Sequence, residues 1–467
     1  MNQGYYQEQF RPQFHFSPET SWTNDPNGLV FYKGNYHLFY QHNPNNVVWG
    51  PMHWGHAMSK DLLHWEHLPI ALYPDELGTI FSGSAVIDFN NSSGFAADES
   101  VPLIAFYSYS KQYQAIAYSN DGINFEKFNG NPVIGLPEEV KDFRDPKAFW
   151  HSKTNKWVSI ISQGDHAVLY SSEDFKSWSL LSIFTTDSPM FWECPDLFPL
   201  VLQDQTIWIV TVANNQYFVG DFDGVTFEPF DEEYRVLDHG KDNYAAVTFN
   251  NIDRRVSIGW MLNWEYANNI PTSTWRGSMT IPRELTLIKL KDDIFVRSFP
   301  VSELDGIMTL EMFEPAIEIL PNKEYIVAED FGQSEISFSA TCSFQFLFKN
   351  DLDERLRLTF DHETLSFTVD RSRSGIVDFN DSFPHNQTLH VFPRLAEAEP
   401  YKFYFLLDWS SLEIFIDQGI SVMTIRMFPN EPYNMAVIEN DPNLPHADEL
   451  LFIFDFKIRK ADSVWEE

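Results

Sequence analysis

The sequence has little cysteine and few cationic side chains. Only two of its 467 residues are cysteines, Cys194 and Cys342, which excludes a disulfide framework and a cysteine-rich zinc site. Lys and Arg together number 32 against 67 Asp and Glu, so the formal net charge is −35. A surface of this charge repels polyanions, so we expect no nucleic-acid partner, and anionic membranes are disfavoured for the same reason.

Long apolar runs are also missing. No segment approaches the length of a membrane span, and the N-terminal residues MNQGYYQEQFRPQF do not contain the apolar core of a signal peptide. We therefore expect no membrane association. The chain is expected to be either cytoplasmic or secreted after removal of a signal peptide.

Aromatic residues, in contrast, are abundant. They make up 16% of the chain, with 42 Phe, 19 Tyr and 14 Trp. Aromatic side chains suit pleated, half-buried surfaces, which favours β structure, and most of these rings are expected to pack in cores. The length predicts two or three domains.

A short pattern recurs in the first part of the chain. In each copy an Asp stands four residues before a Trp or Phe, and an apolar–turn–apolar segment typical of a β-hairpin precedes it. A period of roughly 50 residues with about four strands per unit is typical of a β-propeller, and we count five units between about residues 22 and 295. The copies are SKDLLHWE (59–66), SNDGINFE (119–126), SEDFKSWS (172–179) and DFDGVTFE (221–228), with their aspartates at Asp61, Asp121, Asp174 and Asp223.

The repeat stops after about residue 300. From residue 335 onward, short strand-like segments such as EISFSATCSFQFLFK (335–349) and YKFYFLLD (401–408) alternate with turn signals, which is typical of a β-sandwich. The predicted fold is all-β: a five-bladed β-propeller over 1–300, a connecting segment over 301–334 and a β-sandwich over 335–467. The sandwich is a candidate surface for homo-oligomerisation.

Acidic residues recur where the first strand of each predicted blade begins. Such starts converge near the propeller axis, so their side chains can share one pocket. A lone Asp-Pro is best explained as a turn, whereas several acids at matching blade positions favour a site. Paired carboxylates with different pKa values suit glycoside hydrolysis, in which one attacks and another donates a proton. The acids are Asp25, Asp145, Glu193, Asp196 and Asp242.

Four segments carry a family resemblance. WTNDPNG (22–28), FSGSA (81–85), FRDPK (143–147) and WECPD (192–196) resemble, in this order, the motifs of glycoside hydrolase family 32. That family contains invertases, levanases, inulinases and related fructosyltransferases. The resemblance covers nearly the whole chain and implies a five-bladed propeller followed by a sandwich. It also implies a retaining, exo-acting β-fructofuranosidase that releases terminal β-D-fructose from sucrose or fructans, and the WGPMHWGHAMSKDL segment is closer to levanases and exo-inulinases than to plant vacuolar invertases.

The resemblance implies three catalytic residues. Asp25 would be the nucleophile that forms a covalent fructosyl-enzyme, and Glu193 would be the general acid and then the base. Asp145 would hold sugar hydroxyls and stabilise the transition state. A retaining pair predicts a carboxyl separation of about 5–5.5 Å between Asp25 and Glu193. The implied substrate-binding residues are Asn24, Gln41, Trp49, Trp54, Ser84, Arg144, Asp242 and Trp275.

Other functions stay open at this point. A fructosyltransferase would use the same acids and pass fructose to a sugar, and a non-catalytic fructan-binding protein would share the fold. A related propeller glycosidase acting on arabinose or xylose is the third alternative, although WTNDPNG and WECPD favour fructosides. The acids do not separate hydrolysis from transfer, nor do they rank sucrose, inulin and levan.

No cofactor and no metal are expected. The histidines of HWGH (53–56) are three residues apart and would point to opposite faces of a strand, so they are predicted to be structural. Cys194 has no motif that supplies a base and is expected to be a packed residue beside Glu193. Because Glu193 must be protonated in the first step, we expect a mildly acidic optimum, which a rate rising through alkaline pH would contradict.

Overall fold

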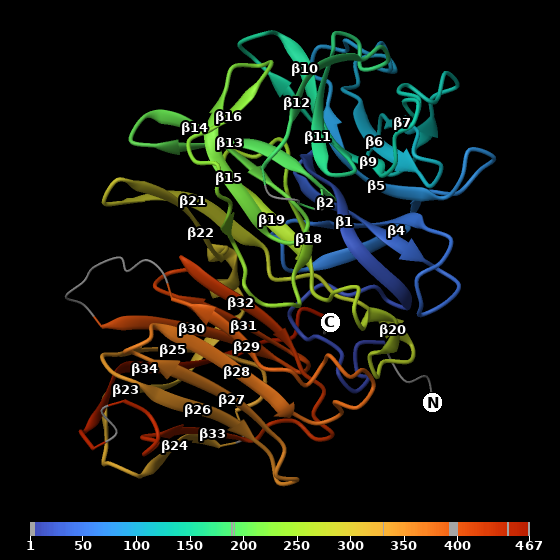
Figure 1. Cartoon of the computed structure of the whole chain (residues 1–467). Coiled ribbons are helices and arrows are strands. Elements are labelled where there is room, and N and C mark those ends of the chain that lie inside the picture. Colours follow the sequence, from blue (N-terminus) through green and yellow to red (C-terminus); the bar gives the residue numbers. More distant parts are fainter. Residues whose placement is uncertain are drawn as a thin grey trace.

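The computed structural model describes residues 5–187, 190, 192–329, 331–391, 400–445 and 448–465. Its regular structure is almost entirely β-strand, which confirms the all-β class. The described residues contain two short 3-10 helices, η1 (Ala267–Asn269) and η2 (Ser302–Ile307), and no helix among them has the length and apolar character needed to cross a membrane. The strands form seven sheets (Figure 1).

Five sheets of four or five strands lie between Ser21 and Pro300; they are antiparallel and follow the chain, except that β20 pairs in parallel with β1 and β17 pairs with β15. The first contains β20 (Trp275–Arg276), β1 (Ser21–Tyr32), β2 (Asn35–Asn43), β3 (His53–Ser59) and β4 (Trp65–Leu72); the second β5 (Ile80–Ile87), β6 (Leu103–Tyr109), β7 (Gln114–Ser119) and β8 (Glu126–Lys127); the third β9 (Phe143–His151), β10 (Lys156–Gln163), β11 (His166–Ser172) and β12 (Ser179–Phe184); the fourth β13 (Asp196–Leu202), β14 (Gln205–Thr211), β15 (Gln216–Phe222), β16 (Phe227–Pro229) and β17 (Arg235–Val236); the fifth β18 (Tyr244–Thr248), β19 (Val256–Trp260), β21 (Arg283–Leu290) and β22 (Asp293–Pro300).

The Asp–aromatic repeat marks a turn in four of these sheets. In each copy one carboxylate oxygen of the repeat aspartate accepts the backbone N–H groups two and three residues further along, at 2.8–3.0 Å. This is the turn that Asp favours because its short side chain can accept from its own backbone. The aromatic residue then anchors the turn to the core, as buried Trp65 and Phe227 do. The repeat is therefore a local folding signal rather than a site.

The first strands of the sheets lie together. Strand β1 contacts β5 and β18, and β5 contacts β9, while Val30 forms a parallel bridge with Asn250 beyond β18. Late in the chain, β20 pairs in parallel with the start of β1, Trp22 opposite Arg276. Asp196, at the start of β13, accepts the backbone N–H of Thr248 in β18 at 2.8 Å. The first strands of the sheets, which we call the inner strands, therefore lie next to one another.

Two six-stranded antiparallel sheets make up the rest of the chain, at the orange and red end of Figure 1. Segment 301–334, expected to connect the two parts, contains one edge strand of each sheet. The first sheet has the order β23 (Met308–Ile319), β34 (Leu451–Ala461), β25 (Ser334–Ala340), β30 (Tyr401–Asp408), β31 (Ser411–Ile416) and β32 (Ser421–Arg426); the second has β24 (Glu324–Glu329), β33 (Met435–Glu439), β26 (Phe344–Lys349), β27 (Arg355–Asp361), β28 (Ser366–Arg373) and β29 (Gln387–His390).

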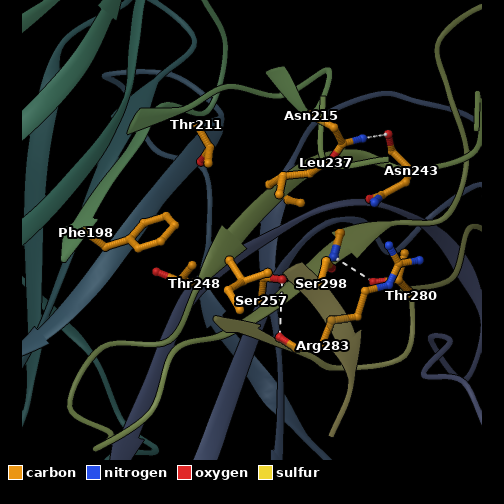
Figure 2. Close-up of a pocket in the computed structure, with 13 residues that line it drawn as sticks. Phe198, Thr211, Asn215, Leu237, Asn243, Thr248, Ser257, Thr280, Arg283 and Ser298 are labelled. Atoms are coloured by element: carbon orange, nitrogen blue, oxygen red, sulfur yellow. Dashed lines mark hydrogen bonds between the residues drawn. The ribbon is translucent and has the colours of Figure 1, made fainter. Parts of the chain in front are cut away.

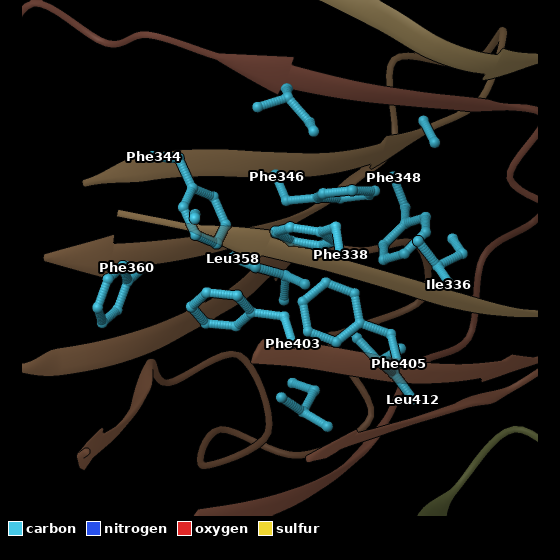
Figure 3. Close-up of a cluster of buried hydrophobic side chains, with 14 of the residues drawn as sticks. Ile336, Phe338, Phe344, Phe346, Phe348, Leu358, Phe360, Phe403, Phe405 and Leu412 are labelled. Atoms are coloured by element: carbon cyan, nitrogen blue, oxygen red, sulfur yellow. The ribbon is translucent and has the colours of Figure 1, made fainter. Parts of the chain in front are cut away.

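Phenylalanine fills the space between these two sheets (Figure 3). Phe338 of β25 pairs with Phe403 of β30, and their rings stack with centroids 5.2 Å apart. Phe344 and Phe346 of β26 contact them from the facing sheet. Side chains alternate across a strand, so one face of each sheet supplies this core, as expected for a β-sandwich.

Buried ion pairs join the sandwich to the first five sheets. The ring of His15 lies between two carboxylates, with Nδ1 2.7 Å from Asp408 and Nε2 2.8 Å from Glu413. Arg283 of β21 contacts Glu413 and places Nη1 2.7 Å from Asp238. All five side chains are buried. The two parts are therefore held together by a hydrogen-bonded network of charges.

Candidate active site

A cleft of about 520 Å³ opens where the inner strands begin. We call it the active cleft. Asp25 comes from β1, Ser82 from β5 and Asp145 from β9, while Glu193 directly precedes β13. Its lining residues are Asn24, Asp25, Gln41, Trp49, Phe81, Ser82, Gln112, Asp142, Arg144, Asp145, Glu193, Trp264 and Asn268.

Irregular backbone turns the acids into the cleft. The pairing of β1 with β2 shifts register between Thr23 and Pro26, next to Asp25, and Asp145 is followed by Pro146, which cannot donate to the strand ladder. Asp145 has a φ of 63° and Cys194 a φ of 44°, a conformation unfavourable for residues other than glycine. Such strain is typical of functional sites, and here it coincides with two of the three X-Pro steps of the motifs, Asp145-Pro146 and Cys194-Pro195.

Asp25 is buried and held by short polar contacts. Ser82 Oγ donates to Oδ2 at 2.6 Å, and Asn24 Nδ2 donates to Oδ1 at 3.0 Å. The thiol of Cys194 lies 3.6 Å from Oδ2. Burial raises the pKa of Asp25, and the negative charge of Glu193 raises it further, while the hydrogen bonds from Ser82 and Asn24 oppose the shift. The donors fix the carboxylate in one orientation.

Glu193 receives a hydrogen bond on each carboxylate oxygen. Arg144 Nη2 donates to Oε1 at 2.7 Å, and the hydroxyl of Tyr244 donates to Oε2. Arg144 also contacts Asp142, so its guanidinium is held by two acids. The side chain of Glu193 is 18% exposed, against 7% for Asp145. Glu193 is thus the better placed of these two to exchange protons with solvent.

Asp145 is the most buried of the three acids, and two other carboxylates lie near it. Its Oδ2 accepts the backbone N–H of Cys194 at 3.1 Å and lies 3.9 Å from Arg144 Nε. Burial raises the pKa of Asp145 to about 7; Arg144 opposes the shift, and Glu193 and Asp25 add to it. Of the three cleft acids, Asp145 and Glu193 lie within ion-pair distance of Arg144. Because burial and the nearby carboxylates outweigh this cation, Asp145 holds a proton more readily than an isolated acid does.

Cys194 sits between two of these acids. Its Sγ lies 3.6 Å from both Asp25 Oδ2 and Asp145 Oδ2. Burial and the neighbouring negative charges raise the pKa of Cys194, so it is a protonated thiol and not a nucleophile. This agrees with its expected role as a packed residue.

Four of the expected substrate-binding residues line the active cleft. They are Asn24, Gln41, Trp49 and Arg144. The Nε2 of Gln41 is buried and has no hydrogen-bond partner among the described residues, so it is a donor available to a substrate hydroxyl. Trp49 is 46% exposed and offers an apolar face at the rim.

Three other expected substrate-binding residues, Trp54, Ser84 and Trp275, lie behind the cleft wall. The Nε1 of Trp54 donates to the carbonyl of Phe81 at 3.0 Å. Ser84 Oγ donates to the carbonyl of Pro146 at 2.8 Å, which ties β5 to β9. Trp275 is buried under the guanidinium of Arg11, 4.5 Å from the ring centroid. All three are buried, because inward-facing strand positions can serve the core as well as a pocket.

Asp242 lies in the network between the two parts of the chain. Arg371 Nη1 donates to it at 2.8 Å, and Tyr266 donates at 2.6 Å. The backbone N–H of Arg426 donates at 2.8 Å. With its exposed fraction at 0% and its oxygens occupied, it does not face the active cleft.

The sequence did not indicate several lining residues. Ser82 stands inside the FSGSA motif, so its signal was present but its contact with Asp25 was not. Trp264 and Asn268 come from the loop around η1, and Asn268 Oδ1 accepts the backbone N–H of Trp49 at 3.0 Å. Gln112 and Asp142 also come from loops, where no periodicity marks a residue. Among the described residues no group of three or more His, Cys, Asp or Glu is arranged to hold a metal ion.

A second, much smaller cavity lies beside Arg283 (Figure 2). Its volume is about 20 Å³, which is room for about one water molecule. Asn215 donates across its wall to the carbonyl of Asn243 at 2.7 Å. It is too small for a sugar.

Comparison with known proteins agrees with the motifs. Residues 15–298 match the glycosyl hydrolases family 32 N-terminal domain, and residues 316–449 match the family's C-terminal region. The chain is 43% identical to a levanase of Bacillus subtilis over 91% of this chain and 67% of that protein, and 35% identical to an extracellular exo-inulinase of Aspergillus ficuum over 91% and 90%. The crystal structure of an exo-inulinase from Aspergillus awamori superposes with a TM-score of 0.89 at 31% identity, covering 98% of this chain and all of that one. The chain therefore belongs to family 32 of the glycosyl hydrolases and is a glycosidase.

Proposed function

We propose that the protein is an exo-acting, retaining β-fructofuranosidase that releases terminal β-D-fructose from sucrose, inulin or levan. The observation that carries the proposal is that Asp25, Glu193 and Asp145 line one cleft. The substrate class is supported by the levanase, the exo-inulinases and an invertase of Debaryomyces hansenii, which is 33% identical.

The same proposal includes the architecture. The five sheets between Ser21 and Pro300 are the blades of a five-bladed β-propeller, which forms a catalytic domain over 1–300. Residues 335–467 form the sandwich domain. Within the connecting segment 301–334, β23 and β24 add edge strands to the sandwich.

In the first step Asp25 attacks the anomeric carbon of fructose. The bond to the leaving oxygen breaks, that oxygen takes the proton of Glu193, and an ester forms between the fructosyl group and Asp25. Ser82 and Asn24 orient Asp25 for this attack. In the second step Glu193, now a carboxylate, takes a proton from water, which displaces Asp25 and frees fructose.

Asp145 stabilises the positive charge that develops on the sugar, and Arg144 orients Glu193. Asp145 accepts hydrogen bonds from sugar hydroxyls, and its buried position makes these bonds stronger than they would be in water. Gln41 donates to a hydroxyl through its unpartnered Nε2, and Trp49 covers an apolar sugar face. Trp54 supports Phe81 of the cleft wall, and Ser84 holds the backbone at Pro146, next to Asp145.

The test is product release by the wild type and by Glu193→Gln. The wild type is expected to release equal amounts of glucose and fructose from sucrose, and fructose as the first product from inulin and levan. Glu193→Gln removes the proton donor and is expected to lower kcat roughly 10²- to 10⁴-fold. The matched control is Glu66→Gln, at an exposed position of β4. Longer sugars as the main products at high sucrose would favour the fructosyltransferase, and full activity of Glu193→Gln would contradict the assigned acid.

A further inference from the structure

A second large cleft, of about 660 Å³, lies at the other ends of the inner strands. We call it the distal cleft. It shares no lining residue with the active cleft. Residues Val86–Asn90, Phe149–Lys153, Trp157, Asp196–Pro199, Val201, Thr206, Trp208, Asn250, Asn251, Asp253 and Arg255 line it.

The strands themselves set the distance between the two clefts. In β9, Asp145 lines the active cleft and Trp150 the distal cleft; in β5, Ser82 and Ile87 do the same. Five residues of strand span about 16 Å. The two clefts are therefore separate sites at opposite ends of β5 and β9, and the start of β13 also lines the distal cleft.

Aromatic rings form part of the distal cleft. Phe89 is 66% exposed and offers its ring to a ligand in this cleft. Trp150 is half-buried and held edge-on against Trp157, with centroids 5.0 Å apart. Phe149 packs on Trp208 at 5.5 Å. These contacts fix the rings before any ligand arrives.

Polar groups without partners lie deeper in the distal cleft. Both Asp196 Oδ1 and Arg255 Nε are buried and have no hydrogen-bond partner among the described residues. The other carboxylate oxygen of Asp196 is 3.0 Å from Lys147 Nζ. Buried polar atoms are normally satisfied by protein or ordered water, so these two leave unused bonding capacity in the wall of the cleft.

The charges around the distal cleft nearly cancel. Lys153 and Arg255 face Asp88, Asp196 and Asp253, and the buried lysine of β9 pairs with Asp196. Neither an anion nor a cation finds an excess of opposite charge. The lining also has amides, Asn90 and Asn251 among them, that can donate and accept. Rings, amides and balanced charge suit a neutral ligand rich in hydroxyl groups.

We propose that the distal cleft binds a neutral oligosaccharide, namely a stretch of a fructan chain, at a site distinct from the active cleft. The identity of the sugar rests on the proposed function; the cleft and its chemistry do not. A second binding site keeps a polymer near the enzyme after each terminal unit is removed, because it raises the local concentration of chain ends.

The test uses the full chain carrying Asp25→Asn, so that no substrate is consumed. Its mobility is measured in native gels containing soluble levan, with and without Phe89→Ala. Loss of one ring contact is expected to weaken binding about fivefold. Phe230, also an exposed phenylalanine at 53% but outside both clefts, supplies the control variant Phe230→Ala. Trp150→Ala is measured as a second variant after its melting temperature has been checked.

The proposal is supported if Phe89→Ala and Trp150→Ala bind levan more weakly while Phe230→Ala binds it as before. Phe89→Ala made in the active enzyme should also keep its kcat/KM for sucrose. Equal mobility of all variants in levan would overturn the proposal. The two proposals fail separately: a wild type that releases no fructose contradicts the catalytic proposal, whereas dependence of levan binding on Phe89 is measured without catalysis.

Discussion

Two groups of buried acids in this protein behave in opposite ways. In the active cleft, burial and mutual repulsion raise the pKa of Asp25 and Asp145. Between the domains, the pKa values of Asp238 and Glu413 are lowered although they are equally buried, because Arg283 contacts both. Burial alone does not decide the charge state of an acid; the number of cations within contact does.

Asp242 illustrates the difference between the acids of the active cleft and the acids between the domains. Its position in the chain resembled that of the cleft acids, yet Arg371, Tyr266 and the backbone of Arg426 surround it. It belongs with the acids that stabilise the fold. In the active cleft, Asp25 is held by the neutral donors Ser82 and Asn24, and Asp145 lies 3.9 Å from Arg144 Nε. This weaker compensation of buried charge costs stability and leaves the acids reactive.

The largest expected effect is on catalysis by the acids of the active cleft. Asp25→Asn removes the proposed nucleophile while keeping the shape, and kcat for sucrose is expected to fall by roughly 10⁴-fold or more. Circular dichroism should show an unchanged fold. Asp61→Asn, in a turn of the repeat, is the matched control and should keep its activity within about twofold; a similar loss in both variants would show that the effect is not specific to Asp25.

The next effect is on the network between the domains. Arg371→Ala leaves Asp242 buried without its cation, and the free energy of unfolding is expected to fall by about 3–5 kcal/mol. Arg373, two residues away, pairs with Asp353 on the surface, where the two side chains are 52% and 72% exposed. Arg373→Ala is expected to change stability by less than about 0.5 kcal/mol. Denaturant titration of both variants measures the difference, and equal losses would remove the distinction.

A smaller effect concerns pH. Hydrogen bonds to Asp408 and Glu413 outweigh burial and raise the pKa of His15 from 6.5 to about 9. The stabilisation from His15 is therefore complete below pH 6.5 and is lost as pH rises through about 9. We expect the free energy of unfolding to fall by about 2–3 kcal/mol over this range. Denaturant titrations of His15→Gln should show a flatter profile between these values; an unchanged slope would assign it to another group.

The smallest expected effect has the opposite sign. The pKa of Asp145 is about 7 in the fold against 3.8 ordinarily, so its contribution to stability falls as pH rises from about 4 to 7. Asp145→Asn is expected to be more stable than the wild type by about 1–2 kcal/mol at pH 8, with the difference shrinking towards pH 4, and to lose activity. A variant less stable than the wild type at pH 8 would contradict this account of the cleft.

Local chemistry made much of the molecule predictable. The Asp–aromatic repeat is a turn closed within four residues, so four sequence copies sufficed to indicate repeated sheets. The acids of WTNDPNG, FRDPK and WECPD were predictable because proline and irregular backbone accompany them. In contrast, β23 is an edge strand with mostly exposed side chains, and its weak apolar pattern resembled a connection.

Two features were not predictable from the sequence: which side of a strand borders the cleft, and which contacts the loops make. Trp54 and Trp275 stand in motifs, but sequence does not tell which side of a strand borders a core and which borders a cleft. Trp264 and Asn268 reach the active cleft from an irregular loop, where contacts depend on the folded chain. The partner of Asp242 lies 129 residues away in Arg371, and no local pattern encodes that distance.

The most direct test of the catalytic account is the stereochemistry of transfer to methanol. The wild type is incubated with sucrose in water containing methanol, and the methyl fructofuranoside formed is identified by nuclear magnetic resonance. Attack by Asp25 followed by attack of methanol inverts the anomeric carbon twice, so the methyl β-fructofuranoside is predicted. The methyl α-fructofuranoside would require a single displacement and would contradict a covalent intermediate on Asp25.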